Sequence, residues 1–202
     1  MLQVEHISKS FGDQRVLDNL TFGVAAGEAV GLLGANGSGK TTLLRIITRL
    51  LEPDGGLVLL DGHPLTQGDM RHIGYLPEER GLYRRMRVAD QALYFMQLKG
   101  MKRREAAEAL RWWFERLGMS EWQQRPAGRL SKGMQQRLQF VVTVAHNPRL
   151  VILDEPFTGL DSAGAAMLMG EIARLKTEGT ALLLSTHNLT AAGQLCDKTI
   201  QL

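Results

Sequence analysis

Short apolar runs, separated by polar or turn-forming residues, fill the first third of the chain. Five of these runs have the length and pattern of strands: 2–7, 16–22, 29–33, 57–62 and 73–77. A further apolar run, 42–47, directly follows a glycine-rich stretch and is typical of a buried helix. Because Pro, Asp and Gly at 52–56 give a strong turn signal, we predict strands on both sides of one helix.

The pattern changes to a helical period between about residues 88 and 146. Three helices are predicted there: 89–98, 103–117 and 131–145. Beyond them we predict three more strands and two helices, in the order 150–153, 162–176, 181–185, 190–195 and 198–202. Strands that alternate with helices are typical of an α/β core. We therefore expect a single domain over 1–202, with a core of 1–83 and 148–202 and an inserted helical subdomain at about 84–147.

Composition narrows the choice of compartment and partner. The 202 residues include 24 Lys and Arg against 21 Asp and Glu, and the net charge of +3 is too small to argue for a nucleic-acid partner. The single cysteine, Cys196, excludes an internal disulfide and a cysteine-based zinc cluster, in agreement with a reducing compartment. No signal peptide and no apolar run of membrane-spanning length is visible. If the protein works at a membrane, a partner must supply the spanning helices.

One glycine-rich stretch lies between the predicted strand at 29–33 and the predicted helix at 42–47. It fits the phosphate-binding pattern G-x-x-x-x-G-K-[ST] and consists of Gly34, Ala35, Asn36, Gly37, Ser38, Gly39, Lys40, Thr41 and Thr42. Strand, loop and helix in this order aim backbone N–H groups and a helix N-terminus at one point, where an anion binds. We expect Lys40 to reach the outer phosphates of a nucleotide and Thr41 to hold Mg²⁺. The alternative is a glycine-rich turn with a chance Lys-Thr.

Two carboxylates, Asp154 and Glu155, directly follow the apolar strand predicted at 150–153. Ligands of parallel sheets bind at the carboxyl ends of the strands, so both side chains are expected at the same edge as the glycine-rich loop. Asp154 then fits a place beside the metal ion held by Thr41, and Glu155 can polarise a water molecule towards the terminal phosphate. The alternative is an Asp-Glu-Pro turn after a core strand.

The stretch Leu130-Ser131-Lys132-Gly133-Met134-Gln135-Gln136-Arg137 resembles the signature of ATP-binding cassette ATPases, commonly Leu-Ser-Gly-Gly-Gln. The resemblance spans nearly the whole chain, because the family's other motifs occur in the same order and spacing. These are Phe11, the glycine-rich loop, Asp154-Glu155, Gly159-Leu160-Asp161 and Ser185-Thr186-His187. The fold that it implies is an α/β P-loop NTPase core with a mixed sheet, an N-terminal antiparallel β part and an inserted α-helical subdomain.

The resemblance also implies roles for residues outside the glycine-rich loop. The residues Ser131, Lys132, Gly133 and Met134 would cap the ATP held by a second copy of the domain, so that two cassettes enclose two ATP molecules head to tail. Ser131 stands where a helix begins, with free N–H groups, and Gly133 lets the backbone approach a ligand. Phe11 would stack on adenine with Val16 beneath it, and Asp161 would cross to the other subunit. His187 would contact the terminal phosphate.

The activity implied is ATP hydrolysis, with Mg²⁺, by the ATPase subunit of a membrane transporter. Its partners would be a membrane permease and a second ATPase domain, and its place the cytoplasmic, inner face of the cell membrane. The run 73–83 looks like a branch of bacterial exporters that includes sodium and drug exporters. Two alternatives stay open: a soluble cassette ATPase of another class, and a regulatory module that hydrolyses ATP poorly.

The chain departs from the family pattern at three positions and at its end. Glu78 stands where a glutamine is usual, and its charge would repel the phosphates unless a cation such as Arg80 pairs with it. Glu78 remains a candidate metal ligand. Lys132 replaces a glycine and Met134 a glutamine, and we hypothesise that Lys132 offsets part of the Glu78 charge. Family members continue beyond the position of Leu202, so the family's C-terminal end is expected to be missing.

Overall fold

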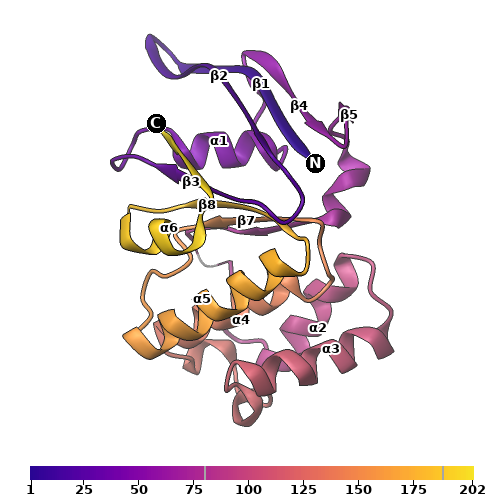
Figure 1. Cartoon of the computed structure of the whole chain (residues 1–202). Helices are drawn as coiled ribbons and strands as arrows, with labels where there is room; N and C mark the ends of the chain where they lie inside the picture. Colours follow the sequence, from indigo (N-terminus) through magenta and orange to yellow (C-terminus); the bar gives the residue numbers. More distant parts are fainter. Residues whose placement is uncertain (80, 188) are drawn as a thin grey trace.

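Two sheets and a layer of helices make up the computed structural model, which describes residues 1–79, 81–187 and 189–202 (Figure 1). The first sheet is antiparallel and has the order β2-β1-β4-β5. Its strands are β1 (Leu2–Phe11), β2 (Gln14–Val24), β4 (Gly55–Leu60) and β5 (His63–Pro64). Alternation between the two faces gives β1 its buried residues Leu2 and Val4. A register shift between Val4 and Ile7, where His6 has a φ of 54°, then brings Ile7 to the same face.

The second sheet has the order β6-β7-β8-β3-β9, and all of its neighbouring strands pair in parallel. Its strands are β3 (Ala29–Leu33), β6 (Ile73–Leu76), β7 (Leu150–Asp154), β8 (Ala181–Ser185) and β9 (Lys198–Gln201). Antiparallel and parallel pairings therefore lie in separate sheets, which refines the expectation of one mixed sheet. The near-continuous apolar runs of β7 and β8 suit strands that are covered on both faces.

Helix α1 (Lys40–Ile47) lies between the two sheets (Figure 1). Its buried residues share one hydrophobic cluster with β1 and with alternate residues of the parallel sheet, such as Ile152 and Leu183. The intervening residues, such as Val151 and Leu182, belong to a second cluster on the opposite face of that sheet. The parallel sheet is thus the wall between two cores, and α1 fixes the glycine-rich loop at its edge.

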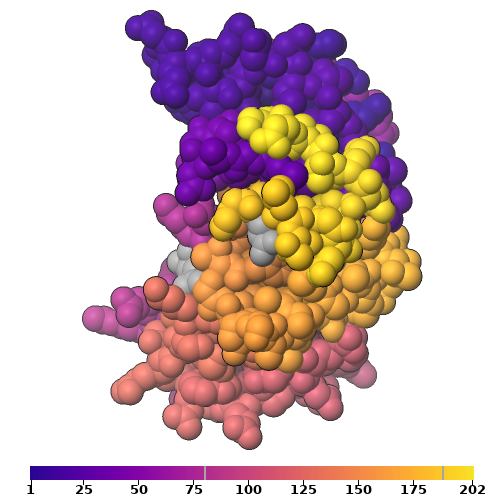
Figure 2. Space-filling view, turned by 60° about the vertical axis from the view of Figure 1, so that its left-hand side comes forward, coloured from indigo at the N-terminus to yellow at the C-terminus, as the bar shows by residue number. Residues whose placement is uncertain are grey.

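Helices cover the other face of the parallel sheet. They are α2 (Val88–Leu98), α3 (Arg103–Arg116), α4 (Lys132–Val144), α5 (Ser162–Thr177) and α6 (Leu189–Leu195). Of three short 3₁₀ helices, η1 (Gln67–His72) lies between β5 and β6, whereas η2 (Ser120–Trp122) and η3 (Ala127–Arg129) lie between α3 and α4. The space-filling view shows the N-terminal strands at one end of the molecule, the helices at the other, and the C-terminal segment across the middle (Figure 2).

Every strand and α-helix predicted from the pattern of apolar residues is present; β3 and β8 have the predicted bounds, and the other elements have shifted ends. Strand β1 continues through Phe11 because it pairs with β2 as far as Gln14, and that pairing is a long-range effect. Strand β5 and the 3₁₀ helices were not predicted, since none of these segments contains a run of apolar residues. Helices α2, α3 and α4 fall inside the segment predicted as a helical subdomain, whose boundaries stay a prediction. Among the described residues, no helix has the length and apolar character of a membrane span.

Candidate nucleotide-binding site

The carboxyl ends of β3, β6, β7 and β8 meet at one edge of the parallel sheet, around a pocket of about 490 Å³. We call it the nucleotide pocket. It is lined by Asn36, Gly37, Gly39, Lys40, Thr41, Thr42, Glu78, Asp154, Glu155, Thr158 and His187. All but Thr158 were predicted from the sequence as site residues. The predicted residues that do not line it are Phe11, Val16, Gly34, Ala35, Ser38 and the four residues Ser131 to Met134.

The glycine-rich loop passes close to β2 at Gly39. A side chain there would place its Cβ atom 2.9 Å from Val16 Cγ1 and 3.0 Å from the Val16 carbonyl oxygen. Gly39 also has a φ of 102°, in the left-handed region that favours glycine. The motif's second glycine is therefore required by contact with β2 as well as by the turn. Val16, predicted to lie beneath adenine, supports the loop in this structure.

The side chain of Lys40 is buried at the centre of the loop. Its Nζ atom donates hydrogen bonds to the carbonyl oxygens of Gly34, at 2.8 Å, and Ala35, at 2.9 Å. The buried Ser38 hydroxyl has no hydrogen-bond partner among the described residues. A buried polar group without a partner costs free energy, so its presence is evidence for a ligand. An ammonium group, an unsatisfied hydroxyl and the N-terminus of α1 together fit the phosphate oxygens of a nucleotide.

Thr41 and Asp154 meet in the nucleotide pocket. The Thr41 hydroxyl donates to Asp154 Oδ2 at 3.0 Å, and the Ser185 hydroxyl donates to Asp154 Oδ1. The position of Ser185 follows from the register, because Asp154 of β7 and Ser185 of β8 are paired residues. No role was predicted for Ser185, although it ends a predicted strand and begins the motif Ser185-Thr186-His187. Hydroxyl and carboxylate oxygens are the ligands that Mg²⁺ prefers, so this group of atoms fits that ion.

Glu155 occupies a strained turn next to Asp154. Its φ of 47° is uncommon for a residue other than glycine, and its N–H donates to the Ser185 carbonyl oxygen at 3.1 Å. Its Oε1 atom accepts a hydrogen bond from the His187 backbone N–H at 3.0 Å and lies 2.9 Å from His187 Nδ1. The two side chains, predicted separately as catalytic, are thus in direct contact. The histidine orients the carboxylate towards the pocket.

Comparison with known proteins decides the family. A model of the ABC transporter family matches residues 17–158, which is more than half of the chain. The chain belongs to the family of ABC transporter ATP-binding subunits. An uncharacterized ABC transporter ATP-binding protein of Methanocaldococcus jannaschii is 46% identical over 199 residues, covering 98% of the chain and 72% of that protein. The uncharacterized ABC transporter ATP-binding protein YhaQ of Bacillus subtilis is 43% identical over 197 residues, covering 98% of the chain and 66% of that protein.

Solved structures agree with this assignment. A structure described as the ATP-binding subunit of an ABC transporter has a TM-score of 0.91 and 32% sequence identity, covering 100% of this chain and 85% of that one. Two relatives have transport functions in their names. The lantibiotic transport protein SrtF of Streptococcus pyogenes is 31% identical over 98% of the chain and 84% of its own length. The Nod factor export protein of Sinorhizobium fredii is 34% identical over 98% of the chain and 58% of its own length.

The signature of this ABC ATPase lies at the start of α4, outside the lining of the nucleotide pocket. Ser131 is the N-cap, and its Oγ atom accepts a hydrogen bond from the Met134 N–H at 3.2 Å. A Cβ atom at Gly133 would lie 3.3 Å from the Gly159 carbonyl oxygen. Close packing against its own chain is therefore one reason for a glycine at this position. The approach of a ligand, predicted from the sequence, would be a second reason. Gln136 donates to the Pro156 carbonyl oxygen at 2.9 Å and so ties α4 to the loop that follows Glu155.

Phe11 lies at the end of β1, 51% exposed and outside the nucleotide pocket. Lys9 Nζ is 5.7 Å from the centre of its ring, so the ring has a cation on one face. The large exposed aromatic surface leaves room for a stacking partner, although neither Phe11 nor Val16 lines a pocket with Lys40. Their predicted contact with adenine stays a prediction.

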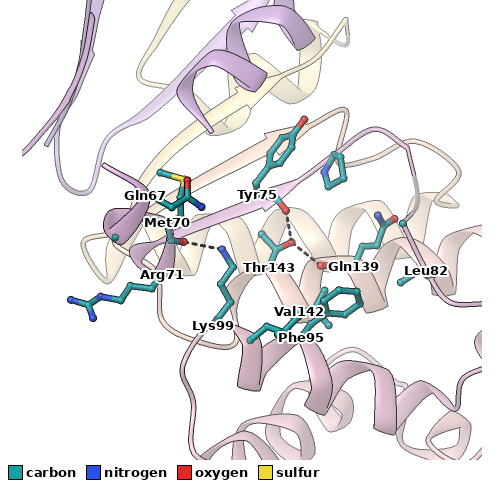
Figure 3. A pocket seen from close by; sticks show the side chains of 14 residues that line it. Gln67, Met70, Arg71, Tyr75, Leu82, Phe95, Lys99, Gln139, Val142 and Thr143 are labelled. Atoms are coloured by element: carbon teal, nitrogen blue, oxygen red, sulfur yellow. Dashed lines mark hydrogen bonds between the residues drawn. The ribbon is translucent and has the colours of Figure 1, made fainter. Parts of the chain in front are cut away.

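A second cavity of about 490 Å³, the apolar groove, lies between the end of β6 and helices α2 and α4 (Figure 3). Met70, Leu82, Phe95, Leu98 and Val142 supply most of its apolar lining. At its edge Lys99 donates to the carbonyl oxygens of Met70, at 2.9 Å, and Ile73, at 2.8 Å. This ammonium group ties the end of α2 to the start of β6.

Proposed function

We propose that this ABC ATPase binds and hydrolyses ATP with Mg²⁺ and drives a membrane exporter. One observation carries the proposal: Thr41 of the glycine-rich loop and Asp154 of β7 are hydrogen-bonded, with Lys40 and Glu155 beside them in a single pocket. A phosphate-binding cation, two oxygen ligands for a metal ion and a candidate base thus share one edge of the sheet. This combination suits phosphoryl transfer to water, which depends on positioning and electrostatic stabilisation.

The triphosphate would lie over the glycine-rich loop. Lys40 would exchange its two carbonyl acceptors, Gly34 and Ala35, for phosphate oxygens, and the Ser38 hydroxyl would gain the acceptor that it lacks. Backbone N–H groups of the loop and of the first turn of α1 would point at the phosphates. They belong to Asn36, Gly37, Gly39, Lys40, Thr41 and Thr42. Phe11 would offer its exposed face to the adenine ring.

Mg²⁺ would be held by Thr41 and Asp154, with Glu78 as a third candidate ligand. When bound, the ion neutralises charge that develops on the phosphate oxygens. Ser185 would keep one Asp154 oxygen hydrogen-bonded, so that the other points towards the ion. Loss of an orienting contact of this kind typically lowers metal affinity or activity by about ten- to a hundredfold.

Glu155 would accept a proton from the attacking water molecule. The contact with His187 would hold the carboxylate in place, and the strained backbone would aim it at the terminal phosphate. Ser131, Lys132, Gly133 and Met134 do not line the pocket of their own chain. A second copy would therefore supply this helix start as the other wall, with Asp161 nearby.

An exporter role is supported by the lantibiotic transport and Nod factor export relatives. Its permease partner would place the ATPase in the cytoplasm, at the inner face of the membrane. The apolar groove is the docking surface that we propose for the permease, because Pro77 and Gly81 line both the groove and the cavity beside Glu78. A permease segment bound in the apolar groove would contact the loop that carries Glu78. A movement of that segment would then shift this loop and Glu78 in the nucleotide pocket.

The deciding experiment compares Glu155→Gln with the unchanged protein. We expect phosphate release to fall by at least about a hundredfold while ATP binding persists, because only the proton acceptor is lost. The matched control is Glu121→Gln, which changes an exposed glutamate of η2. This variant should hydrolyse ATP at the normal rate. Equal turnover in Glu155→Gln would remove Glu155 as the base. ATP binding with no turnover in the unchanged protein would favour the regulatory module instead.

A further inference from the structure

A third cavity of about 470 Å³ adjoins the nucleotide pocket on the side of α1 and β6, and we call it the arginine pocket. It shares Thr41, Glu78 and Asp154 with the nucleotide pocket. Arg45 also lines it. Thr41 and Arg45 are one helical turn apart on α1, so their side chains project on the same face of the helix. The candidate metal ligand Thr41 and the guanidinium of Arg45 therefore face the same space.

The charges in the arginine pocket are unequal. Glu78, Glu79 and Asp154 bring three carboxylates, and Arg45 is the single cation among the described lining residues. Asp154 is already bound by Thr41 and Ser185. Among the residues that the structure describes, neither Arg45 nor Glu78 forms an ion pair. Arg45 is thus available to pair with a carboxylate of the arginine pocket other than Asp154.

Tyr75 lines the arginine pocket together with these charges. It lines both the apolar groove and the arginine pocket, and in Figure 3 its ring points away from Thr143, to the other side of the strand. Burial raises the pKa of its phenol to about 12, and the charges of Asp154, Arg45 and Glu78 all act on it. Arg45 and Glu78 therefore lie close enough to the same hydroxyl group for their charges to be felt there.

We propose that Arg45 is the counter-charge of Glu78 and the positioning residue that allows a glutamate to stand beside the bound phosphates. The inference rests on the proposed function. A guanidinium binds a carboxylate through two parallel hydrogen bonds, which fixes its orientation as well as its charge. Arg80, considered from the sequence for this role, lies outside the described residues. Lys132 does not line either pocket of its own chain and is available to Glu78 only from a second copy.

The test is a double-mutant cycle with Arg45→Gln, Glu78→Gln and the double variant. Affinity for a non-hydrolysable ATP analogue is measured by calorimetry in EDTA, so that metal ligation by Glu78 does not contribute. Arg45→Gln should weaken binding about tenfold where Glu78 is present, because an unpaired carboxylate then faces the phosphates. Where position 78 is glutamine, the same substitution should change the affinity by less than about twofold.

Controls separate this pairing from a general effect of charge. Arg103→Gln removes the same charge from an exposed position and should leave the affinity unchanged. Direct attraction between Arg45 and the phosphates would weaken binding equally with either residue at position 78, and such additive effects would overturn the inference. Arg45→Lys keeps the charge but not the two parallel hydrogen bonds, so it should restore only part of the affinity. If the unchanged protein binds no nucleotide, the proposed function itself is wrong, whereas binding with additive effects removes the Arg45 role alone.

Discussion

Thr41 and Asp154 are 113 residues apart in the chain, yet the hydroxyl of one donates to the carboxylate of the other at 3.0 Å. The contact joins the first turn of α1 to the end of β7. It forms because β3, which leads to α1, and β7 both flank β8 in the parallel sheet. The two parts of the candidate metal site are thus held in place by the order of the strands.

Thr41→Val removes this hydroxyl while keeping the shape of the side chain. We expect the concentration of Mg²⁺ needed for half-maximal nucleotide binding to rise at least about tenfold, because one oxygen ligand and its contact to Asp154 are lost. A Mg²⁺ titration of ATP-analogue binding measures this. Thr177→Val, at an exposed helix end, is the matched control. An unchanged Mg²⁺ requirement would place the metal ion elsewhere.

His187→Ala separates the positioning of Glu155 from nucleotide binding. Without the imidazole, Glu155 keeps the backbone hydrogen bond from position 187 but loses its contact with Nδ1. We expect kcat for ATP hydrolysis to fall about a hundredfold, with a much smaller change in KM. The exposed His63→Ala is the control. A rise in KM with kcat preserved would mean that the histidine binds nucleotide without orienting the base.

Lys132→Gly, introduced both into the unchanged protein and into the Glu78→Gln variant, tests the offset of charge predicted from the sequence. Since Lys132 lies outside the nucleotide pocket of its own chain, an effect on Glu78 requires a second copy. We expect coupling between the two substitutions of about fivefold in ATP affinity at protein concentrations that favour the dimer. Dilution should abolish this coupling. Strictly additive effects at high concentration would exclude the pairing.

His146 makes stability dependent on pH. Burial, and then the charge of Lys99, lower the pKa of His146 from 6.5 to about 4 in the folded protein. The unfolded chain therefore binds a proton first, and the free energy of unfolding falls as the pH drops from 6.5 towards 4. Between pH 7 and pH 4.5 the unchanged protein should lose about 2 kcal/mol more than His146→Leu, by urea unfolding. Parallel pH profiles would contradict a buried, neutral His146.

Local sequence patterns were sufficient to predict the separate elements of the fold. Apolar periodicity located the strands and the α-helices, because burial of one face repeats every two residues in a strand and every 3.6 in a helix. The glycine-rich loop could be predicted because its backbone requires a positive φ at position 39. Glycine adopts that conformation most easily, so the requirement is visible in the sequence. The main site residues could be predicted because they lie at the ends of predicted elements. They are Lys40 and Thr41 at the start of α1, and Asp154 and Glu155 at or directly after the end of β7.

Which of these elements come into contact depends on long-range packing. The order β6-β7-β8-β3-β9 differs from the order along the chain, so no local pattern could pair Asp154 with Ser185 or bring Arg45 and Glu78 to one cavity. Likewise, the contact between Gly133 and the Gly159 carbonyl oxygen depends on how α4 packs against the loop after β7. Local sequence sets the conformation of each element, whereas long-range packing of the two cores sets the distances between their ends.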